Sequence, residues 1–225
     1  MLSKLSEYRL FWREFRQTFN TTGAVLPSGK RLCRALASQV GVTNRPCRIL
    51  EVGPGTGAVT SEIIRQMGAD DHLDLVEINA RFAEVLRQRL AGDVTWIRVA
   101  HRVRVLEMPI EKLPADTAYD CIVSGLPLNN FSCEFVERVL LHFHLLAAEG
   151  CTLSFFEYVL IREAKSLVTS PAERRRLQGI GQLLGQQFSD WEFRRDCVLA
   201  NVPPAWVHHL RFARAIPSLE VAAAV

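Results

Sequence analysis

The sequence is short of the features that mark secreted, membrane-spanning or metal-binding proteins. No apolar run approaches the roughly 20 residues of a transmembrane helix. The segment Met1 to Asn20 carries charges throughout and has no continuous apolar core, so we expect no signal peptide there. The 6 cysteines lack the spacing of metal ligands, and several lie in apolar segments. These absences favour a cytoplasmic protein with reduced, buried cysteines and no metal site.

The composition also argues against a disordered chain. Of the 225 residues, 48% are hydrophobic and 23% are charged, which is typical of globular proteins. This length is enough to bury a full core, and it predicts one domain or a domain with an appendage. The net charge is only +3, so the distribution of charge matters more than its total.

Strand-like and helix-like segments alternate along the chain. Helices are expected over Ala58–Met67, Ala80–Leu90 and about Cys133–Ala148. Strands are expected over Arg48–Val52, Leu73–Ile78, Arg102–Leu106, Tyr119–Ser124, Glu192–Asn201 and Trp206–Phe212, and a turn at Gly150 leads into another. Val94–His101 fits either an extra strand or a loop. This pattern predicts an α/β fold with a doubly wound, mostly parallel sheet and an antiparallel pair at its C-terminal edge.

A glycine-rich segment, "ILEVGPGTGAVT", joins the first expected strand to the first expected helix. Gly53, Gly55 and Gly57 let the backbone turn tightly and approach a ligand. Their spacing is G-x-G-x-G, whereas dinucleotide-binding loops have G-x-G-x-x-G. Pro54 offers no N–H to a phosphate, and the charge of Glu51 would repel one. An acid at this place suits the cationic amino group of a methionine moiety.

A second acid, Glu77, closes the second expected strand, where a carboxylate can accept hydrogen bonds from both hydroxyls of a ribose. Together with Glu51, it favours S-adenosylmethionine over a dinucleotide as the ligand. The alternative is a structural glycine turn in an unrelated α/β protein.

On "LEVGPGTG" and the second-strand acid, the chain resembles the class I S-adenosylmethionine-dependent methyltransferases from Arg48 to Phe212. The resemblance implies a Rossmann-like, seven-stranded sheet with the cofactor across the carboxyl ends of its strands. It divides the chain into an N-terminal helix over 1–20, a methyltransferase domain over 21–215 and a tail over 216–225. The cofactor-binding residues that it implies are Thr22, Gly23, Glu51, Gly53, Pro54, Gly55, Gly57, Glu77, Ile78, Pro109, Ile110, Ser124, Gly125 and Leu126.

The segment expected to contact adenine departs from the family pattern. Many members carry "GDA" after the third strand, and this chain has "MPI" at 108–110. The missing acid leaves the adenine amine without its usual partner, unless Glu111 supplies one.

The segment after the fourth strand, "SGLPLNN", usually contacts the methyl acceptor. Adenine methyltransferases that act on nucleic acids have an aromatic residue directly after the proline, which stacks on the base. Here Pro127 is present and the aromatic residue is not. We therefore expect no nucleic acid partner.

The first twenty residues suggest an interfacial helix. Leu5, Tyr8, Phe11, Trp12, Phe15 and Phe19 form one helical stripe, and Lys4, Arg9, Arg13 and Arg16 fall largely to its flanks. Basic charges beside an aromatic-rich face are typical of a helix that lies on an anionic membrane. The alternative is that the stripe packs on the domain's own core.

The segments "TTGAVLPSG", "EVGPGTGAVT", "SGLPLNN" and "NVPPAWVHHLRF" together resemble the bacterial phospholipid N-methyltransferases. These enzymes methylate the amine of phosphatidylethanolamine and its methylated intermediates, and close relatives methylate ornithine lipids. The resemblance implies a membrane aminolipid as substrate and a peripheral location on the inner face of the cytoplasmic membrane. The sequence around "GLPLNN" differs from that of the phosphatidylethanolamine enzymes, so an ornithine lipid is the alternative acceptor.

Methylation of an amine needs a group that favours the neutral nitrogen. A primary lipid amine resembles lysine, whose pKa is about 10.4, so it arrives mostly protonated. Our candidates are Tyr158, Tyr8, Asn129 and Glu157. We assign no chemistry to the histidines. Lys30, Arg31, Arg162 and Lys165 are candidates for contact with the anionic part of a headgroup.

Two competing interpretations remain at this stage. One is an RNA adenine N6-methyltransferase, whose glycine loop is similar. The other is a non-catalytic protein that binds S-adenosylmethionine or adapts other proteins to a membrane.

Overall fold

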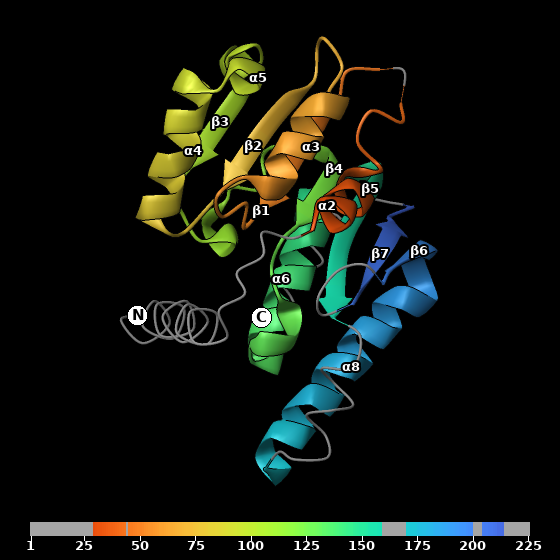
Figure 1. Cartoon of the computed structure of the whole chain (residues 1–225). Helices are drawn as coiled ribbons and strands as arrows, with labels where there is room; N and C mark the ends of the chain where they lie inside the picture. The colour runs from red at the N-terminus through yellow and green to blue at the C-terminus, as the bar shows by residue number, and fades with distance from the viewer. Residues whose placement is uncertain (1–28, 44, 159–169, 200–203, 214–225) are drawn as a thin grey trace.

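The computed structural model describes residues 29–43, 45–158, 170–199 and 204–213. One seven-stranded sheet with the order β3-β2-β1-β4-β5-β7-β6 runs through the molecule (Figure 1). Its strands are β1 Arg48–Val52, β2 His72–Val76, β3 Val103–Leu106, β4 Tyr119–Ser124, β5 Ala147–Tyr158, β6 Glu192–Val198 and β7 Ala205–Arg211. The chain reverses its direction across the sheet after β3, and the crevice at this switch point lies beyond the ends of β1 and β4.

β7 runs antiparallel to both of its neighbours, β5 and β6, whereas all other pairs of neighbouring strands are parallel. The expected mostly parallel, seven-stranded sheet with an antiparallel C-terminal edge is confirmed.

Helices cover both faces of the sheet. One face carries α2 Lys30–Ala37, α3 Ala58–Gln66, α4 Ala80–Gly92 and the short α5 Val94–Ile97. The other carries α6 Cys133–Leu146 and α8 Pro171–Trp191, and α8 extends well beyond the sheet edge (Figure 1). Three 3₁₀ turns lie between these elements: η1 Ala100–Arg102, η2 Ile110–Lys112 and η3 Leu128–Asn130.

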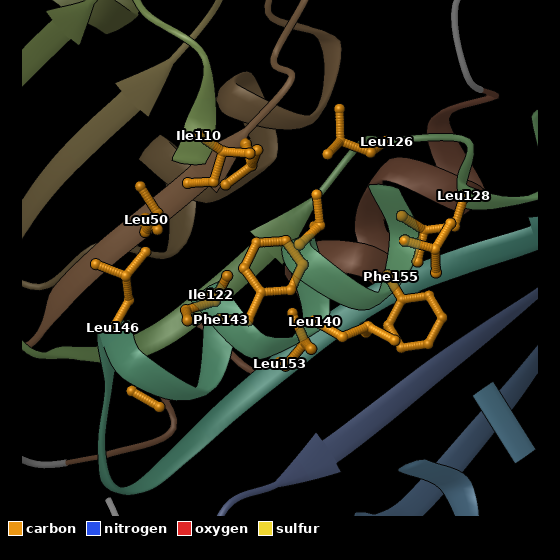
Figure 2. Close-up of a cluster of buried hydrophobic side chains, with 14 of the residues drawn as sticks. Leu50, Ile110, Ile122, Leu126, Leu128, Leu140, Phe143, Leu146, Leu153 and Phe155 are labelled. Atoms are coloured by element: carbon orange, nitrogen blue, oxygen red, sulfur yellow. The ribbon is translucent and has the colours of Figure 1, made fainter. Parts of the chain in front are cut away.

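The larger apolar core lies between the sheet and α6. Figure 2 shows Phe143 of α6 among Leu50, Ile122 and Leu153, which come from three neighbouring strands. Phe143 and Ile122 are 0% exposed. Burial of such side chains stabilises the fold by about 1.5–3 kcal/mol each. This core fixes β1, β4 and β5 relative to one another, so the loops that follow these strands start from rigid positions.

Side chains of β5 alternate between the two faces of the sheet. Phe155 packs in the core on the α6 and α8 face, and Phe156 packs in the core beneath α2 and α3. The same alternation sends Glu157 towards the α6 and α8 face and Tyr158 towards the α2 face.

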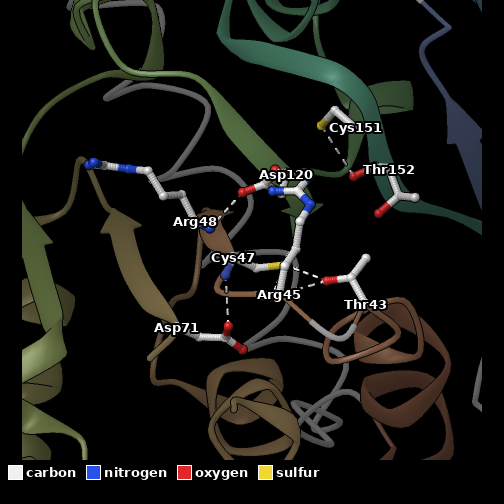
Figure 3. A network of polar contacts seen from close by, with 8 residues as sticks. All are labelled: Thr43, Arg45, Cys47, Arg48, Asp71, Asp120, Cys151 and Thr152. Atoms are coloured by element: carbon white, nitrogen blue, oxygen red, sulfur yellow. Dashed lines mark hydrogen bonds and ion pairs between the residues drawn. The ribbon is translucent and has the colours of Figure 1, made fainter. Parts of the chain in front are cut away.

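Polar contacts fix the amino end of β1, far from the switch-point crevice. Figure 3 shows Asp71 accepting a hydrogen bond from the Cys47 N–H at 2.8 Å. Asp120 accepts one from the Arg48 N–H at 2.9 Å and pairs with the Arg45 guanidinium at 2.6 Å. These contacts satisfy two backbone N–H groups at the amino end of β1.

Two expectations about local structure were wrong. The segment 94–101 is helical rather than a strand or loop, because the Asp93 side chain caps it by accepting from the Thr95 N–H at 2.9 Å and Trp96 anchors it at 1% exposure. β5 begins at Ala147, before the expected turn at Gly150. A register shift between Tyr119 and Cys121 accommodates this glycine, whose φ is 77°.

No helix in the described ranges has the length and apolarity that crossing a membrane requires. The expected N-terminal helix over 1–20, with Tyr8, lies outside the described residues, as do Thr22, Gly23, Arg162, Lys165 and the tail over 216–225.

Candidate functional site

The glycine loop between β1 and α3 has a left-handed backbone at all three glycines. The φ angles of Gly53, Gly55 and Gly57 are 71°, 58° and 86°. A Cβ on Gly53 would lie 2.9 Å from Leu126 Cδ2, and one on Gly57 would lie 2.5 Å from the Trp96 ring. Around Gly55, by contrast, no atom lies within 4 Å of such a Cβ. The loop is therefore packed on two sides and open at Gly55, where a ligand can approach the backbone.

Arg89 of α4 holds the outer side of this loop, and the sequence analysis missed it. Its Nη1 donates to the carbonyls of Thr56 at 3.0 Å and Gly57 at 3.1 Å. Its Nη2 donates to Ser61 Oγ at 3.0 Å, and the guanidinium lies over the Trp96 ring at 4.1 Å. A long-range contact of this kind, 32 residues from Gly57, leaves no periodic signal in the sequence.

Glu77 follows β2 and turns back towards the glycine loop. Its Oε2 accepts a hydrogen bond from the Gly55 N–H at 3.0 Å, and its Oε1 accepts one from the Asn79 N–H at 2.8 Å. The side chain is 1% exposed, and burial raises its pKa, while the backbone donors oppose this shift. Each carboxylate oxygen has a second lone pair, so the group can still accept bonds from a ribose.

Glu51 lies on β1 and faces the opposite side of the sheet from Leu50. It is 1% exposed, and its Oε2 has no hydrogen-bond partner among the described residues. Its pKa is raised to about 8, mainly by burial and also by the nearby Glu77, while interactions with Thr60 oppose the shift. A buried carboxylate without a cationic partner is costly, so this oxygen fits a positively charged ligand group.

A small pocket opens beside Glu77 at the carboxyl ends of β1 and β2. Its lining is mostly apolar with one carboxylate, which matches the chemistry of a nucleoside, while its volume of about 10 Å³ is room for about one water molecule. Six lining residues are among the predicted cofactor-binding residues: Gly53, Glu77, Ile78, Pro109, Ile110 and Leu126. The other three, Val52, Val76 and Met108, flank those motifs and were missed, although the last residues of the two strands were natural candidates. Glu111 does not line this pocket; its charge acts on His142 of α6 instead.

The turn after β4 closes tightly against the glycine loop. Gly125 N–H donates to the Val52 carbonyl at 2.8 Å, and a Cβ on Gly125 would lie 2.7 Å from the Gly53 carbonyl. The buried Ser124 hydroxyl accepts from the Leu126 N–H at 3.3 Å. This packing places the turn after β4 directly beside the pocket, which Leu126 lines.

Two of the four predicted catalytic residues, one in η3 and one near the end of β5, are in contact. Asn129 Nδ2 donates to Glu157 Oε1 at 3.2 Å. Arg176 of α8 donates to the carbonyl oxygens of Asn129, at 3.0 Å, and of Phe131. Asn129 Oδ1 is buried and has no hydrogen-bond partner among the described residues, so it can accept a bond from a ligand.

Tyr158, the first predicted base, lies on the other face of the sheet. It packs edge-on against Phe156 at 5.0 Å between ring centroids, in the core beneath α2 and α3, and burial raises its pKa. The structure thus separates Tyr158 from the Asn129–Glu157 pair. A raised pKa keeps the phenol protonated at neutral pH, which suits a donor better than a base.

Comparison with known proteins identifies the chemistry of this site. A family model described as a methyltransferase domain matches residues 49–150, from β1 through β5's first residues. The chain carries a class I S-adenosylmethionine-dependent methyltransferase domain. The cofactor of the domain is therefore S-adenosylmethionine, as expected. The open side of Gly55 and the unpaired Glu51 oxygen fit this cofactor.

Relatives of the methyltransferase domain act on different acceptors. An ornithine lipid N-methyltransferase of Singulisphaera acidiphila is 28% identical over 130 residues, which are 58% of this chain and 67% of that protein. A ubiquinone/menaquinone biosynthesis C-methyltransferase of Marinomonas sp. is 25% identical over 73% of this chain and 64% of its own length. A ribosomal RNA small subunit methyltransferase A of Parasynechococcus marenigrum is 34% identical over 36% of this chain and 26% of its own length.

The same fold occurs in solved structures. A putative O-methyltransferase from Klebsiella pneumoniae superposes with a TM-score of 0.61 at 21% identity, over 84% of each chain. At this identity the likeness establishes the fold and not the acceptor.

Proposed function

We propose that this methyltransferase transfers methyl groups to the amine of a membrane lipid headgroup, either phosphatidylethanolamine and its methylated intermediates or an ornithine lipid. The observation that carries the proposal is the Asn129–Glu157 pair, with Nδ2 donating to Oε1 at 3.2 Å. In this proposal, the Glu157 carboxylate and the Asn129 Oδ1, which has no hydrogen-bond partner among the described residues, would face the acceptor. The similarity to an ornithine lipid N-methyltransferase supports the same choice.

Glu157 and Asn129 suit an ammonium acceptor. A lipid amine arrives protonated, and a carboxylate attracts it and accepts its proton. The unpartnered Asn129 Oδ1 would accept a second N–H and orient the nitrogen. A ring carbon, the acceptor of a C-methyltransferase, has no N–H to donate to these two oxygens.

The cofactor side would be held by the glycine loop and its two acids. Glu51 would pair with the amino group of the methionine half, and Glu77 would accept the ribose hydroxyls while it holds the Gly55 N–H. S-Adenosylmethionine, when bound, supplies an activated methyl group on a sulfonium. The protein then has to align the nitrogen with this methyl group and exclude water.

Recognition of the headgroup's anionic part and of the membrane belongs to the same proposal. Lys30 and Arg31 begin α2 and are exposed, so they are available for a phosphate or carboxylate. The N-terminal segment 1–20 would bind the anionic surface on the inner face of the cytoplasmic membrane, as its basic, aromatic-rich stripe suggests.

The proposal is tested by offering several acceptors in parallel. Purified protein and methyl-labelled S-adenosylmethionine are incubated with vesicles that contain phosphatidylethanolamine or ornithine lipid, with a quinone precursor and with ribosomal RNA. We expect label in one or both aminolipids. Label in the quinone or the RNA alone would overturn the proposal in favour of a C-methyltransferase or an RNA methyltransferase.

A further inference from the structure

His208 of β7 lies between two carboxylates, and the established chemistry assigns it no role. Its Nδ1 forms a hydrogen bond with Glu192 Oε1 at 2.6 Å, whereas its Nε2 lies 3.3 Å from Glu157 Oε2 and has no hydrogen-bond partner among the described residues. The imidazole stacks on Phe188 of α8 at 4.1 Å and on Phe155 of β5 at 5.4 Å between centroids. His208 is 2% exposed, so the aromatic rings shield it and fix its plane.

The three side chains connect the acceptor side to a more exposed position. Glu157 receives the Asn129 amide on one oxygen and faces His208 with the other. Glu192 stands at the start of β6, at the opposite end of the sheet from the carboxyl end of β5, and its side chain is 19% exposed. The row Glu157–His208–Glu192 therefore runs from the proposed acceptor site, along the α6 and α8 face, towards solvent.

We propose that Glu157, His208 and Glu192 form a proton path that carries the proton of the acceptor amine out of the site. This inference rests on the proposed function, since only an ammonium acceptor has this proton to lose. Glu157 would touch the substrate, and His208 and Glu192 would act through it.

The transfer balances without any further reactant. The ammonium gives one proton to the Glu157 carboxylate, and its nitrogen keeps the lone pair. The Glu157 proton passes to His208 Nε2, while the Nδ1 proton passes to Glu192 and from there to water. The relay leaves the imidazole proton on Nε2, and its transfer to Nδ1, which changes no proton count, returns His208 to its first tautomer before the next cycle. The 2.6 Å contact places the first tautomer's proton on Nδ1, which donates to Glu192.

Other charged groups near His208 do not interrupt this row. Arg195 of β6 lies opposite His208 in the β6–β7 pair, but the Arg195 guanidinium lies over the Trp206 ring, 4.9 Å from its centroid. His209 faces the other side of the sheet, where it contacts Ser154 Oγ at 2.8 Å and Asp196 Oδ2 at 3.3 Å. His209 is 0% exposed, and no contact links it to Asn129 or Glu157. It is thus a matched control: the same residue type, on the same strand and equally buried.

The path is tested by the pH dependence of kcat for methylation of the preferred aminolipid by the full chain. We expect His208→Gln to lower kcat at pH 7 by about tenfold or more, as the loss of general base catalysis does. The deficit should shrink as the pH rises above about 10.4, where most of the free amine is neutral. Glu192→Gln should change the profile in the same direction, and His209→Gln should leave its shape as in the wild type.

The shape of the profile separates the outcomes. A purely structural loss lowers kcat by one factor at every pH, and this result for both His208→Gln and Glu192→Gln would overturn the path while the proposed function stands. The same holds if both variants match the wild type. If no aminolipid is methylated by the wild-type protein, the proposed function fails and the path fails with it.

Discussion

Glu77 binds the glycine loop through a hydrogen bond from the Gly55 N–H to its Oε2, at 3.0 Å. This contact joins two segments, 22 residues apart, that the sequence analysis assigned to different halves of one cofactor. Gly55 is also the position at which the loop is open to a ligand. One carboxylate thus shapes the loop and lines the pocket beside it.

Glu77→Ala is therefore expected to weaken S-adenosylmethionine binding by about tenfold to a hundredfold, because hydrogen bonds to a charged group contribute about 1.5–3 kcal/mol. Isothermal titration calorimetry measures this change. Glu84→Ala, which removes an exposed carboxylate of α4, is the control and should bind as the wild type does. An unchanged affinity for Glu77→Ala would remove Glu77 from the cofactor site.

Glu51→Gln should raise the stability of the cofactor-free protein at pH 8 and lower its affinity for S-adenosylmethionine. Burial raises the pKa of this carboxyl to about 8 from 4.5, so the cofactor-free folded protein holds a proton that the unfolded chain has lost. The free energy of unfolding therefore falls as the pH rises through this window. Without cofactor, Glu51→Gln should have a higher Tm than the wild type at pH 8 and a similar Tm at pH 5.

The affinity for S-adenosylmethionine is a second test of the role of Glu51. Between pH 6 and pH 8 the wild-type affinity for S-adenosylmethionine should rise, because ionised Glu51 pairs with the cofactor's amino group. The affinity of Glu51→Gln should be lower and nearly independent of pH in this range. Calorimetry that finds the two proteins equal at pH 8 would place the methionine half elsewhere.

Arg89→Ala should loosen the glycine loop, and it removes no side chain that we assign to direct contact with the cofactor. It removes two hydrogen bonds to loop carbonyls and the stacking on Trp96, so we expect cofactor affinity to fall about tenfold and Tm to fall by several degrees. Arg87→Ala, on the exposed side of the same helix, is the matched control. Equal affinities for the two variants would show that the loop holds its shape without Arg89.

Deletion of Met1 to Phe19 should abolish sedimentation of the protein with vesicles rich in anionic lipid. The segment supplies the basic charges and the aromatic stripe on which binding depends. Deletion of the tail over 216–225 is the control and should leave sedimentation intact. If the shortened protein sediments as the wild type does, membrane binding does not depend on the stripe. The stripe would then be assigned to packing on the domain's own core.

Local signals predicted much of the fold. The bounds of β1 and β4 were predicted to the residue, because each is a buried apolar run that ends at a glycine-bearing turn. The sheet and the cofactor followed from the glycine loop and Glu77, because each directly follows a recognisable strand. Segment 94–101 was misassigned, since the Asp93 cap and the burial of Trp96 outweigh the β-branched composition there.

The sequence predicted fewer features of the proposed acceptor site. Asn129 and Glu157 were both candidates, but their contact spans 28 residues and depends on which face of β5 each side chain takes. Tyr158 was preferred to Glu157 although the two neighbours must face opposite ways. His208 received no role, because its two carboxylate partners come from β5 and β6 and meet only in the folded sheet.

The central claim is that the methyl group reaches a lipid nitrogen, and the position of the label in the product tests it most directly. The protein is incubated with trideuteromethyl-labelled cofactor and mixed aminolipid vesicles that also contain a quinone precursor, and the extracted products are fragmented by tandem mass spectrometry. The account predicts labelled methyl groups on the headgroup amine and none on the acyl chains. Label that appears on a ring carbon of a quinone, with every lipid headgroup unlabelled, would contradict it.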